Sequence, residues 1–542
     1  MNRGRWVSIF SILLALTALW GAAKINTDYL KRVPHVQDSV NTWFQARLFA
    51  MGRTYIETPK NVKSFSSELL VIKDGRWYCH YPFLHPFITM LGMQAGVVWL
   101  VNPLLAAITV ILVYTIGTEC YNRRVGLWAA IFLVSSPFFM VMSASYMSHP
   151  LGLFLTASSL LFFIRQMKAP SVKNAVFAGS SLGLLFNTRP LTAFALALPL
   201  IGFHLRNRDG FKKSSLRHLS IFLMVLFIWV GMFFLYSSNL SGKTLQFATQ
   251  TKVSETVGPT SIKLLNRFFN SFSALGVARS GHTAAKGLGT TRALLELLHT
   301  YALNWPSWFN FSFFLIPLIP IKRKEYDHFF YVTFISIPFL YAFYWRSAIM
   351  YGPRYIYEVM PMVVLLSARG MDVCLESAEW VHNHTFLRNW KSFSSARMTT
   401  AFCLYIFTGI LIATNINQFY FRKDYDLKTK PIVSLVPMTV SAMKNFNGIK
   451  RTIPDTVEEL GITNAIVFVQ DKRWQGFGSV ASFNHPLLNT DVVYARDLGD
   501  DSLKAVMDMF PNKSAYWTQY PKVKVHALFY DKHNDSLRKI PL

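Results

Sequence analysis

Long apolar runs recur along most of this 542-residue chain, and no other feature limits its fold as strongly. Lipid offers no hydrogen bonds to backbone N–H and C=O groups, so a run of roughly 20 apolar residues predicts an α-helix that crosses the bilayer. We expect about eleven such helices, and therefore an α-helical polytopic membrane protein. The runs lie at residues 6–23, 101–119, 126–145, 150–165, 175–187, 191–205, 218–237, 302–320, 327–345, 360–375 and 399–417.

The charges indicate the orientation of these helices. Charged residues make up only 15% of the chain, and the net charge is +27. The basic residues cluster in alternate connections between the apolar runs, such as 206–217 and 322–324. Cytoplasmic connections carry the basic residues, so the N-terminus is expected inside and, after eleven crossings, the C-terminus outside. The expected partner of these charges is the lipid bilayer, and nucleic acid is not expected to bind.

The first apolar run, at 6–23, resembles a signal peptide because it follows Arg3 and Arg5. It is about 18 residues long, however, and no convincing A-x-A cleavage site follows it. We interpret it as a retained anchor helix. The expected location is the cell inner (plasma) membrane, which the chain crosses several times with its N-terminus in the cytoplasm.

Three segments expected outside are too long to be simple connections: 24–100, 238–301 and the tail from 421. In the first, Trp43–Met51 and the apolar stretch 87–99 are typical of helices that lie in the membrane interface. We expect a transmembrane domain at 1–420 and a small extracytoplasmic α/β domain at 421–542. Within the tail, strands are expected at Asn464–Gln470, Asp491–Arg496 and Val523–Tyr530, and a helix at Ser502–Phe510.

Charged residues near membrane depth are the first candidates for function. Asp38 follows the anchor helix by about fifteen residues, and it is either a general base at the membrane surface or an exposed loop aspartate. Arg189 and Arg354 lie on the side that disfavours basic residues. We expect them to share one cavity and to bind a lipid phosphate, since a guanidinium group binds phosphate oxygens bidentately. The alternative is that both are interfacial anchors. Glu358 follows Arg354 by four positions and is expected to pair with it.

Five histidines, His35, His80, His85, His149 and His282, are expected on the outer side. Histidine is a common metal ligand, but no HxxxH or HExxH spacing occurs. No cofactor is predicted, although a divalent metal is compatible with these residues. The four cysteines form no CxxC pair, so a disulfide framework is not expected either.

Several segments together resemble a known family. They are HVQDSVNTWFQARLFAMG from His35, GRWYCHYPFLHP from Gly75, WLVNPLLAA from Trp99, SPFFMVMSASYMSHP from Ser136, GHTAAKGLGT from Gly281 and YGPRYIYEVMP from Tyr351. In this order they resemble the glycosyltransferases of the GT-C fold that use lipid-phosphate sugars, especially the protein O-mannosyltransferase and aminoarabinose transferase families. The resemblance spans roughly residues 5–420. One departure is that Ser39 follows Asp38, where the family usually has Asp-Glu.

The resemblance implies transfer of a sugar from a polyprenyl-phosphate carrier to a glycan, lipid or protein acceptor outside the cytoplasm, with inversion. It implies that Asp38 is the catalytic base and that Arg189 and Arg354 bind the donor phosphate. Trp43, Tyr81 and Trp305 are then expected either to face the sugar or carrier or to belong to an aromatic interface belt. Further residues expected near the substrate cavity are His80, His85, His149, His282 and Glu358.

Two other functions remain open at this point. A transporter or lipid flippase is one, although we find no inverted repeat of the kind that many transporters carry. A catalytically inactive membrane scaffold is the other, because the acidic neighbour of Asp38 is missing. Large outer loops and a folded outer tail favour the enzyme.

Overall fold

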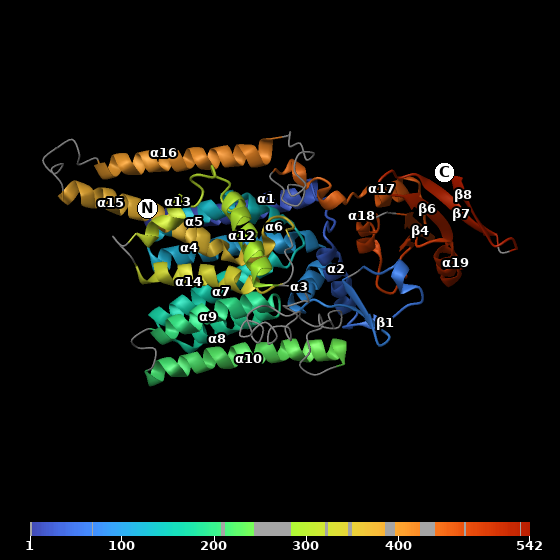
Figure 1. Ribbon diagram of the computed structural model, residues 1–542, viewed down its shortest axis with the longest axis horizontal. Coiled ribbons are helices and arrows are strands. Elements are labelled where there is room, and N and C mark those ends of the chain that lie inside the picture. The colour runs from blue at the N-terminus through green and yellow to red at the C-terminus, as the bar shows by residue number, and fades with distance from the viewer. Residues whose placement is uncertain are drawn as a thin grey trace.

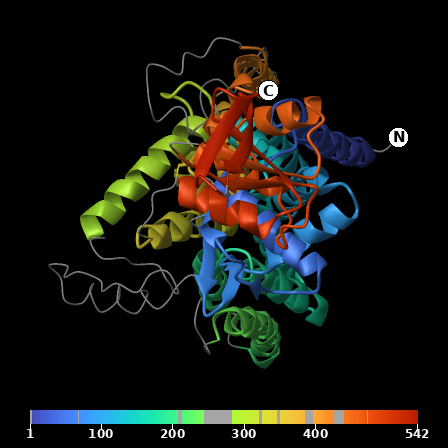
Figure 2. The same cartoon turned by 90° about the vertical axis from the view of Figure 1, so that its right-hand side faces the viewer.

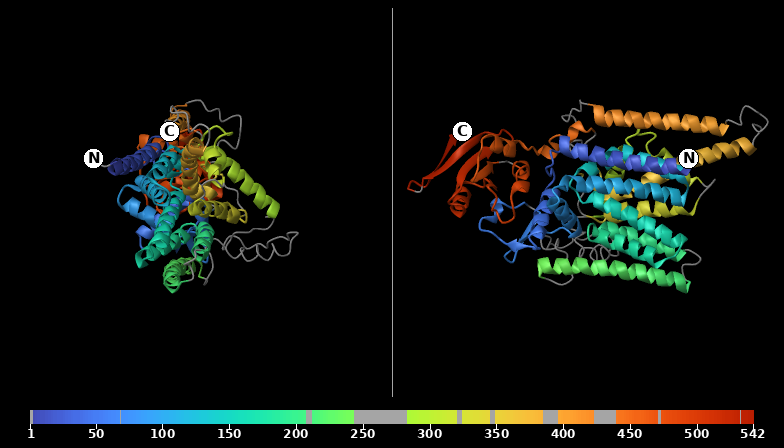
Figure 3. Two further views of the ribbon diagram at one scale, coloured as in Figure 1. Left: turned by 90° about the vertical axis from the view of Figure 1, so that its left-hand side faces the viewer. Right: turned by 180° about the vertical axis from the view of Figure 1, so that it is seen from behind.

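The computed structural model describes residues 3–542 apart from 68, 207–211, 243–282, 320–323, 345–348, 385–395, 423–438, 471–472 and 532. A bundle of roughly parallel helices forms the larger part of the molecule, as the two views in Figure 3 show. The first long connection and a C-terminal sheet domain lie together at one end of this bundle (Figure 1). The N-terminus lies towards the opposite end.

The bundle helices coincide with most of the expected apolar runs. They are α1 (Arg3–Asp28), α4 (Val101–Cys120), α5 (Arg123–Ser135), α6 (Pro137–Ala144), α7 (His149–Lys168), α8 (Val172–Phe186), α9 (Pro190–Arg206), α10 (Lys213–Ser241), α14 (Glu325–Tyr341), α15 (Met360–His384) and α16 (Ala396–Ile416). Helix α15 is buried along most of its described length and forms the centre of the core, whereas α10 and α16 expose apolar side chains at the edges of the bundle. Such exposure is expected where lipid is the solvent.

Among the described residues, five helices are long and apolar enough to cross a membrane: Ile9–Asp28, Val98–Cys120, His149–Lys168, Ser215–Ser241 and Thr399–Phe421. A sixth candidate is the pair α5 and α6, which bends by 62°. The bend lies at Ser136, between the two helices, and the hydroxyl of Ser136 caps α6 just before Pro137. Helices α8 and α9 are apolar but shorter. Membrane-spanning helices are therefore present, and the number of about eleven stays a prediction.

One expected helix is wrong. Residues 302–320 contain only a short α13 (Ser312–Leu315) and a 3-10 turn, η4 (Ile316–Leu318), in their described part. Asn304 has a left-handed backbone (φ 52°), and Pro306 follows two residues later, so no helix continues through this stretch. The helix forms earlier instead, as α12 (Ala284–Tyr301), inside the expected loop 238–301. Helix α12 runs across the bundle rather than along it (Figure 1).

The first long connection folds into two helices and a small sheet. Helices α2 (Gln37–Ala50) and α3 (Leu84–Gln94) contain most of the two stretches expected to lie in the interface. Between them, β1 (Ile56–Glu57), β3 (Arg76–Cys79) and β2 (Leu70–Lys73) form an antiparallel sheet in that order. A 3-10 turn, η2 (Val98–Leu100), then leads into α4.

The C-terminal part forms a five-stranded mixed sheet, in the order β5 (Val492–Arg496), β4 (Ala465–Gln470), β6 (Ser514–Gln519), β7 (Val525–Asp531) and β8 (Ser536–Pro541). Helices α17 (Thr452–Glu459), α18 (Trp474–Gly478) and α19 (Asp500–Met509) accompany it. The central strand β4 pairs in parallel with both neighbours and is buried on both faces, which explains its continuous apolar sequence. The sequence predicts β4, β5, β7 and α19, but β6 and β8 were not expected.

The sheet domain packs directly on the first long connection (Figure 2). Leu48, Phe65 and Trp77 of that connection share one apolar cluster with Phe468 and Leu503 of the sheet domain. Side chains from both parts thus form a common core, and α2 lies between the sheet domain and the helical bundle.

Candidate active site at the domain-facing end of the bundle

Asp38 lies in the first turn of α2, where the helix dipole favours a negative charge. Its Oδ2 accepts a hydrogen bond from Arg354 Nη1 at 3.0 Å, and its Oδ1 accepts one from the hydroxyl of Tyr81. The Asp38 side chain keeps 25% of its surface exposed, whereas the side chain of Arg354 is buried. The Asp38 side chain is therefore partly reachable from solvent, although each of its carboxylate oxygens accepts a hydrogen bond.

Arg354 begins η6 (Arg354–Val359), a 3-10 stretch that leads into α15. The two preceding residues have unusual backbones: Tyr351 has φ 60° and Gly352 has φ 117°. A Cβ atom at Gly352 would lie 2.7 Å from the ring of Phe138, so glycine is required by both conformation and space. This tight turn directs Arg354 towards α2.

A second ion pair joins Arg189, between α8 and α9, to Glu358 of η6. Arg189 Nε lies 2.9 Å from Glu358 Oε1, and Nη2 donates to the hydroxyl of Tyr341 at 2.8 Å. Arg189 Nη1 lies 3.2 Å from His149 Nε2, while His149 Nδ1 faces Glu358 Oε1 at 3.4 Å. The Nδ1 atom of His149 thus lies beside the carboxylate without a well-oriented hydrogen bond to it. Gly152 lies beside this pair and has no room for a side chain.

The ring of Tyr355 connects the two ion pairs. The guanidinium carbon of Arg354 is 5.3 Å from the ring centroid, and that of Arg189 is 5.9 Å from it. The two guanidinium groups therefore lie within about 11 Å of each other, although 165 residues separate them in sequence. Both guanidinium groups thus lie beside the same aromatic ring.

The two carboxylates differ in their electrostatics. Burial favours the neutral form of Asp38, but the charge of Arg354 and the hydrogen bond from Tyr81 outweigh it and hold the pKa of Asp38 below its ordinary value. Burial raises the pKa of Glu358 to about 7, against the opposing charge of Arg189. Asp38 is thus fully ionised at neutral pH, and Glu358 titrates near neutrality.

The expected pairing of Glu358 with Arg354 is wrong. Two residues four apart share a face only in a regular α-helix, and η6 is a 3-10 stretch with a non-helical Ile356 (φ −112°, ψ 22°). Arg354 therefore reaches Asp38 of α2, and Glu358 reaches Arg189.

The structure gathers several, but not all, of the sequence-predicted residues around these pairs. His80 Nδ1 lies 2.7 Å from the carbonyl oxygen of Leu69, which can only accept a hydrogen bond, and the ring of His80 contacts that of Tyr81. Trp43 packs edge-on against Tyr146, with ring centroids 5.1 Å apart. His85 is buried on α3.

Three other predicted residues are not part of these pairs in the described structure. Trp305 packs against Phe132, Phe309 and Phe313 in the bundle core, and none of its described contacts involves Asp38, Arg189 or Arg354. His35 hydrogen-bonds the backbone of Val33. His282 lies outside the described residues. Within the described part of the chain, no group of three or more His, Cys, Asp or Glu side chains could hold a metal ion.

Sequence reasoning missed Tyr341, Thr192 and Gly152, which shape the surroundings of Arg189. Tyr341 and Thr192 lie on expected apolar helices, where a hydroxyl gives no periodic signal. Tyr355 was detectable in principle, because it adjoins Arg354 in the segment YGPRYIYE.

Comparison with known proteins gives one family match and several similar folds. Residues 80–233 match the family described as dolichyl-phosphate-mannose-protein mannosyltransferase. No curated protein sequence matches the chain. The fold is similar to that of ArnT from Cupriavidus metallidurans in the apo state, with a TM-score of 0.51, 13% identity, and coverage of 96% of this chain and 94% of that one.

Two further solved structures are similar. ArnT from Cupriavidus metallidurans bound to undecaprenyl phosphate gives a TM-score of 0.50 at 13% identity, again over 96% of this chain and 94% of that one. The archaeal oligosaccharyltransferase AglB from Archaeoglobus fulgidus, in complex with an inhibitory peptide and a dolichol-phosphate, gives 0.46 at 11% identity, over 98% of this chain and 74% of that one. The resemblance indicated by the sequence motifs is thus confirmed: residues 80–233 match a lipid-phosphate-sugar mannosyltransferase family, and the chain has the GT-C fold of ArnT.

Proposed function

We propose that this protein is a membrane glycosyltransferase that moves a sugar from a polyprenyl-phosphate carrier to an acceptor outside the cytoplasm, with inversion at the anomeric carbon. The proposal rests on the two ion pairs at the domain-facing end of the bundle. There, a partly exposed carboxylate lies near two buried arginines. The family match and the ArnT-like fold support the same class of donor.

In the proposed reaction, Asp38 accepts the proton of an acceptor hydroxyl, whose oxygen forms a bond to the anomeric carbon. The bond between that carbon and the phosphate oxygen breaks, and the carrier phosphate leaves with both electrons. Arg354 and Arg189 stabilise the charge that develops on this phosphate. A single displacement of this kind inverts the anomeric centre and needs only one base, which fits the absence of a second carboxylate beside Asp38.

Arg354 has two roles in this account. It neutralises Asp38 while no donor is bound, at 3.0 Å. An arriving phosphate competes for the same guanidinium group, because charge-assisted bonds to phosphate are as strong as those to carboxylate. Transfer of Arg354 towards the phosphate would raise the basicity of Asp38 when the donor is in place.

The topology belongs to the same proposal. We infer about eleven crossings, a cytoplasmic N-terminus and an extracytoplasmic C-terminal domain in the inner membrane. The N-terminus and the C-terminal domain lie towards opposite ends of the bundle, which supports this arrangement. A phosphatase fused after Leu542 should be active. A fluorescent protein that folds only in the cytoplasm should stay dark at the same place. The reverse pattern would require a different number of crossings.

Proteoliposomes provide the test of the reaction. They would contain the purified protein, a labelled polyprenyl-phosphate sugar and an envelope extract as the source of acceptors. We expect label to leave the carrier lipid and to appear on a second molecule, which mass spectrometry then identifies. Label that crosses the bilayer while still attached to its carrier would instead establish a flippase and overturn the proposal.

A further inference from the structure

The turn at residues 445–448, which leads into the C-terminal sheet domain, contacts both chain segments that carry the Asp38–Arg354 pair. Phe446 stacks on Tyr351, with ring centroids 4.3 Å apart and planes at 17°. Tyr351 is three residues before Arg354 and adopts the left-handed backbone described above. Such a conformation is strained for a non-glycine residue and persists where packing enforces it. Both rings are buried, so their stack is well placed to enforce it.

The next residue of the same turn, Asn447, contacts the chain segment just before Asp38. Asn447 Nδ2 donates a hydrogen bond to the backbone oxygen of His35 at 3.2 Å, just ahead of the first turn of α2. Asn445 and Asn447 both have positive φ, of 59° and 55°, which bends this turn sharply. Adjacent residues of a single turn thus contact the segment before Asp38 and the segment before Arg354.

A third contact fixes the far end of α2. Arg47 donates through Nη1 to Asn484 O at 2.7 Å and through Nη2 to Ser482 O at 2.5 Å. The Asn484 side chain in turn exchanges two hydrogen bonds with the backbone of Tyr494 in β5, at 2.7 and 2.8 Å. The loop that receives Arg47 is therefore fastened to the sheet.

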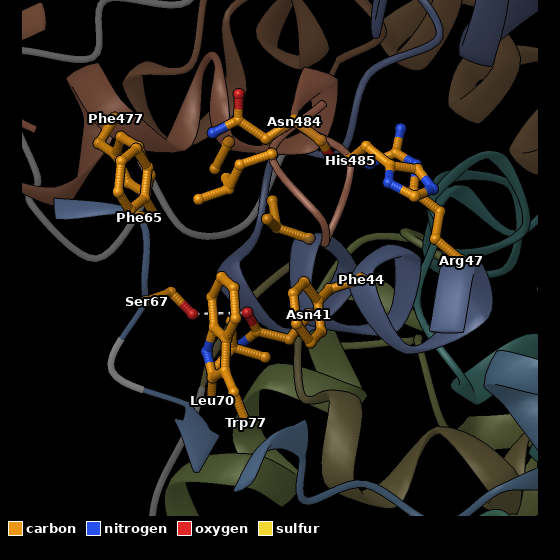
Figure 4. Close-up of a pocket in the computed structure, with 13 residues that line it drawn as sticks. Asn41, Phe44, Arg47, Phe65, Ser67, Leu70, Trp77, Phe477, Asn484 and His485 are labelled. Carbon is orange, nitrogen blue, oxygen red and sulfur yellow. Dashed lines mark hydrogen bonds between the residues drawn. The ribbon is translucent and has the colours of Figure 1, made fainter. Parts of the chain in front are cut away.

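Beside this contact lies a small pocket between α2 and the sheet domain (Figure 4). Asn41, Phe44 and Trp77 line it from one side, and Phe477 and His485 from the other. At 100° per residue, Phe44 and Arg47 point away from the face of α2 that carries Asp38. The sheet domain therefore contacts α2 through side chains other than Asp38 itself.

We propose that the C-terminal domain sets the position of the Asp38–Arg354 pair, and that Phe446, Asn447 and Arg47 are positioning residues for sugar transfer. This inference rests on the proposed function. It assigns the sheet domain a part in the reaction without a substrate contact of its own. A displacement of about 1 Å at a catalytic group can lower a rate by as much as 10²-fold, so loosening these contacts should be visible in kcat.

The experiment compares three variants with the wild type in nanodiscs. Phe446→Ala removes the stack on Tyr351, and Phe446→Tyr keeps it. Ile453→Ala is the matched control, because Ile453 is buried in the same domain on the other face of the sheet, away from α2. All rates are expressed per folded molecule. We expect Phe446→Ala to lower kcat about tenfold, with a smaller change in the donor KM, and Phe446→Tyr to restore it. Ile453→Ala should retain the wild-type kcat.

Hydrogen exchange separates this inference from the proposed function. Phe446→Ala should speed amide exchange in peptides that cover residues 35–42 and 351–359, and Ile453→Ala should not. Equal kcat values and equal exchange for the wild type and Phe446→Ala would overturn the inference. An equal loss of kcat in Ile453→Ala would also overturn the inference, because the loss would then follow from a less stable domain and not from the contact with Tyr351. Absence of transfer by the wild type would overturn the proposed function instead.

Discussion

Two arginine–carboxylate clusters lie towards opposite ends of the bundle, and they are built differently. The domain-side cluster consists of Asp38, Arg354, Arg189 and Glu358. The far-end cluster consists of Arg369, Asp372, Asp327 and Arg124. Arg369 lies next to Gly370, which packs against α13 at the end remote from the sheet domain.

The far-end carboxylates have more partners. Asp372 binds Arg124 at 2.6 Å, Asn122 at 2.9 Å and Arg369 at 3.2 Å. Asp327 accepts from Tyr121 at 2.7 Å and from the backbone of Lys324 at 2.8 Å. Arg369 is fully buried in the regular helix α15. Several partners surround these charges, as in a stabilising network, although Asp372 Oδ1 and Arg124 Nε make no well-oriented hydrogen bond among the described residues.

The domain-side cluster is held less completely. Asp38 has one arginine and one tyrosine and remains partly exposed, and Arg354 follows a turn with two positive φ angles. Neither oxygen of Glu358 accepts a well-oriented hydrogen bond from the described residues. The two clusters thus differ in exposure and in backbone: the far-end carboxylates are buried beside a regular helix, whereas Asp38 is partly exposed and its arginine follows a strained turn.

The largest expected effect concerns Asp38. Asp38→Asn keeps the shape and removes the base, so transfer should fall by roughly 10²–10⁴-fold while binding of the donor survives. Rates from labelled carrier-linked sugar would measure this. Asp28→Asn is the control, since Asp28 is an exposed aspartate that pairs only with Lys24 among the described residues. Equal rates for both variants would exclude Asp38 as the base.

At the far end, the effect should appear in stability. Arg369→Ala leaves Asp327 and Asp372 buried with one cation fewer, which should cost about 3–5 kcal/mol. Denaturant unfolding in detergent would measure the loss. Transfer per folded molecule should stay at the wild-type level. A specific loss of turnover with unchanged unfolding would contradict the division of roles between the two clusters.

Gly152→Ala should have an intermediate effect on the domain-side cluster. The new Cβ would lie 2.7 Å from Glu358 Oε1 and 3.0 Å from Arg189 Cδ, so the pair must move, at a cost of about 1–3 kcal/mol. We expect about tenfold slower transfer. Gly202→Ala is the control, because nothing lies within 4 Å of its added methyl group. Should both variants match the wild type, the Arg189–Glu358 pair has no part in the reaction.

Much of this architecture could be predicted from the sequence. Apolar runs located most bundle helices, because lipid exposure and a buried core both demand apolar residues. Asp38, Arg189 and Arg354 stood out because charge is costly at that depth. The partners could not be predicted: 316 residues separate Asp38 from Arg354, and only the kink at Ile356 decides that Glu358 faces Arg189. The run at 302–320 misled because buried residues such as Phe313 and Phe314 are apolar in any backbone conformation.

The smallest effect is a pH shift. Asp38 faces Arg354, Tyr81 and His80, and the first two hold its pKa below the ordinary value of about 3.9. Its contribution to stability is therefore present above the unfolded-state pKa and is lost as pH falls through the lower folded-state pKa. The acid limb of kcat/KM should lie below the ordinary carboxyl value, and Arg354→Gln should move it upward. If the acid limb of kcat/KM stayed at the same pH in Arg354→Gln, a group other than Asp38 would control it.

The account rests on the domain-side arginines as the site of the donor phosphate, and direct binding tests this. A labelled polyprenyl phosphate would be titrated into the wild type, Arg354→Ala, Arg189→Ala and, as a far-end control, Arg124→Ala. Loss of charge-assisted bonds should weaken binding about 10–100-fold in the first two variants, and Arg124→Ala should bind as the wild type does. Unchanged affinity in both Arg354→Ala and Arg189→Ala would contradict the account.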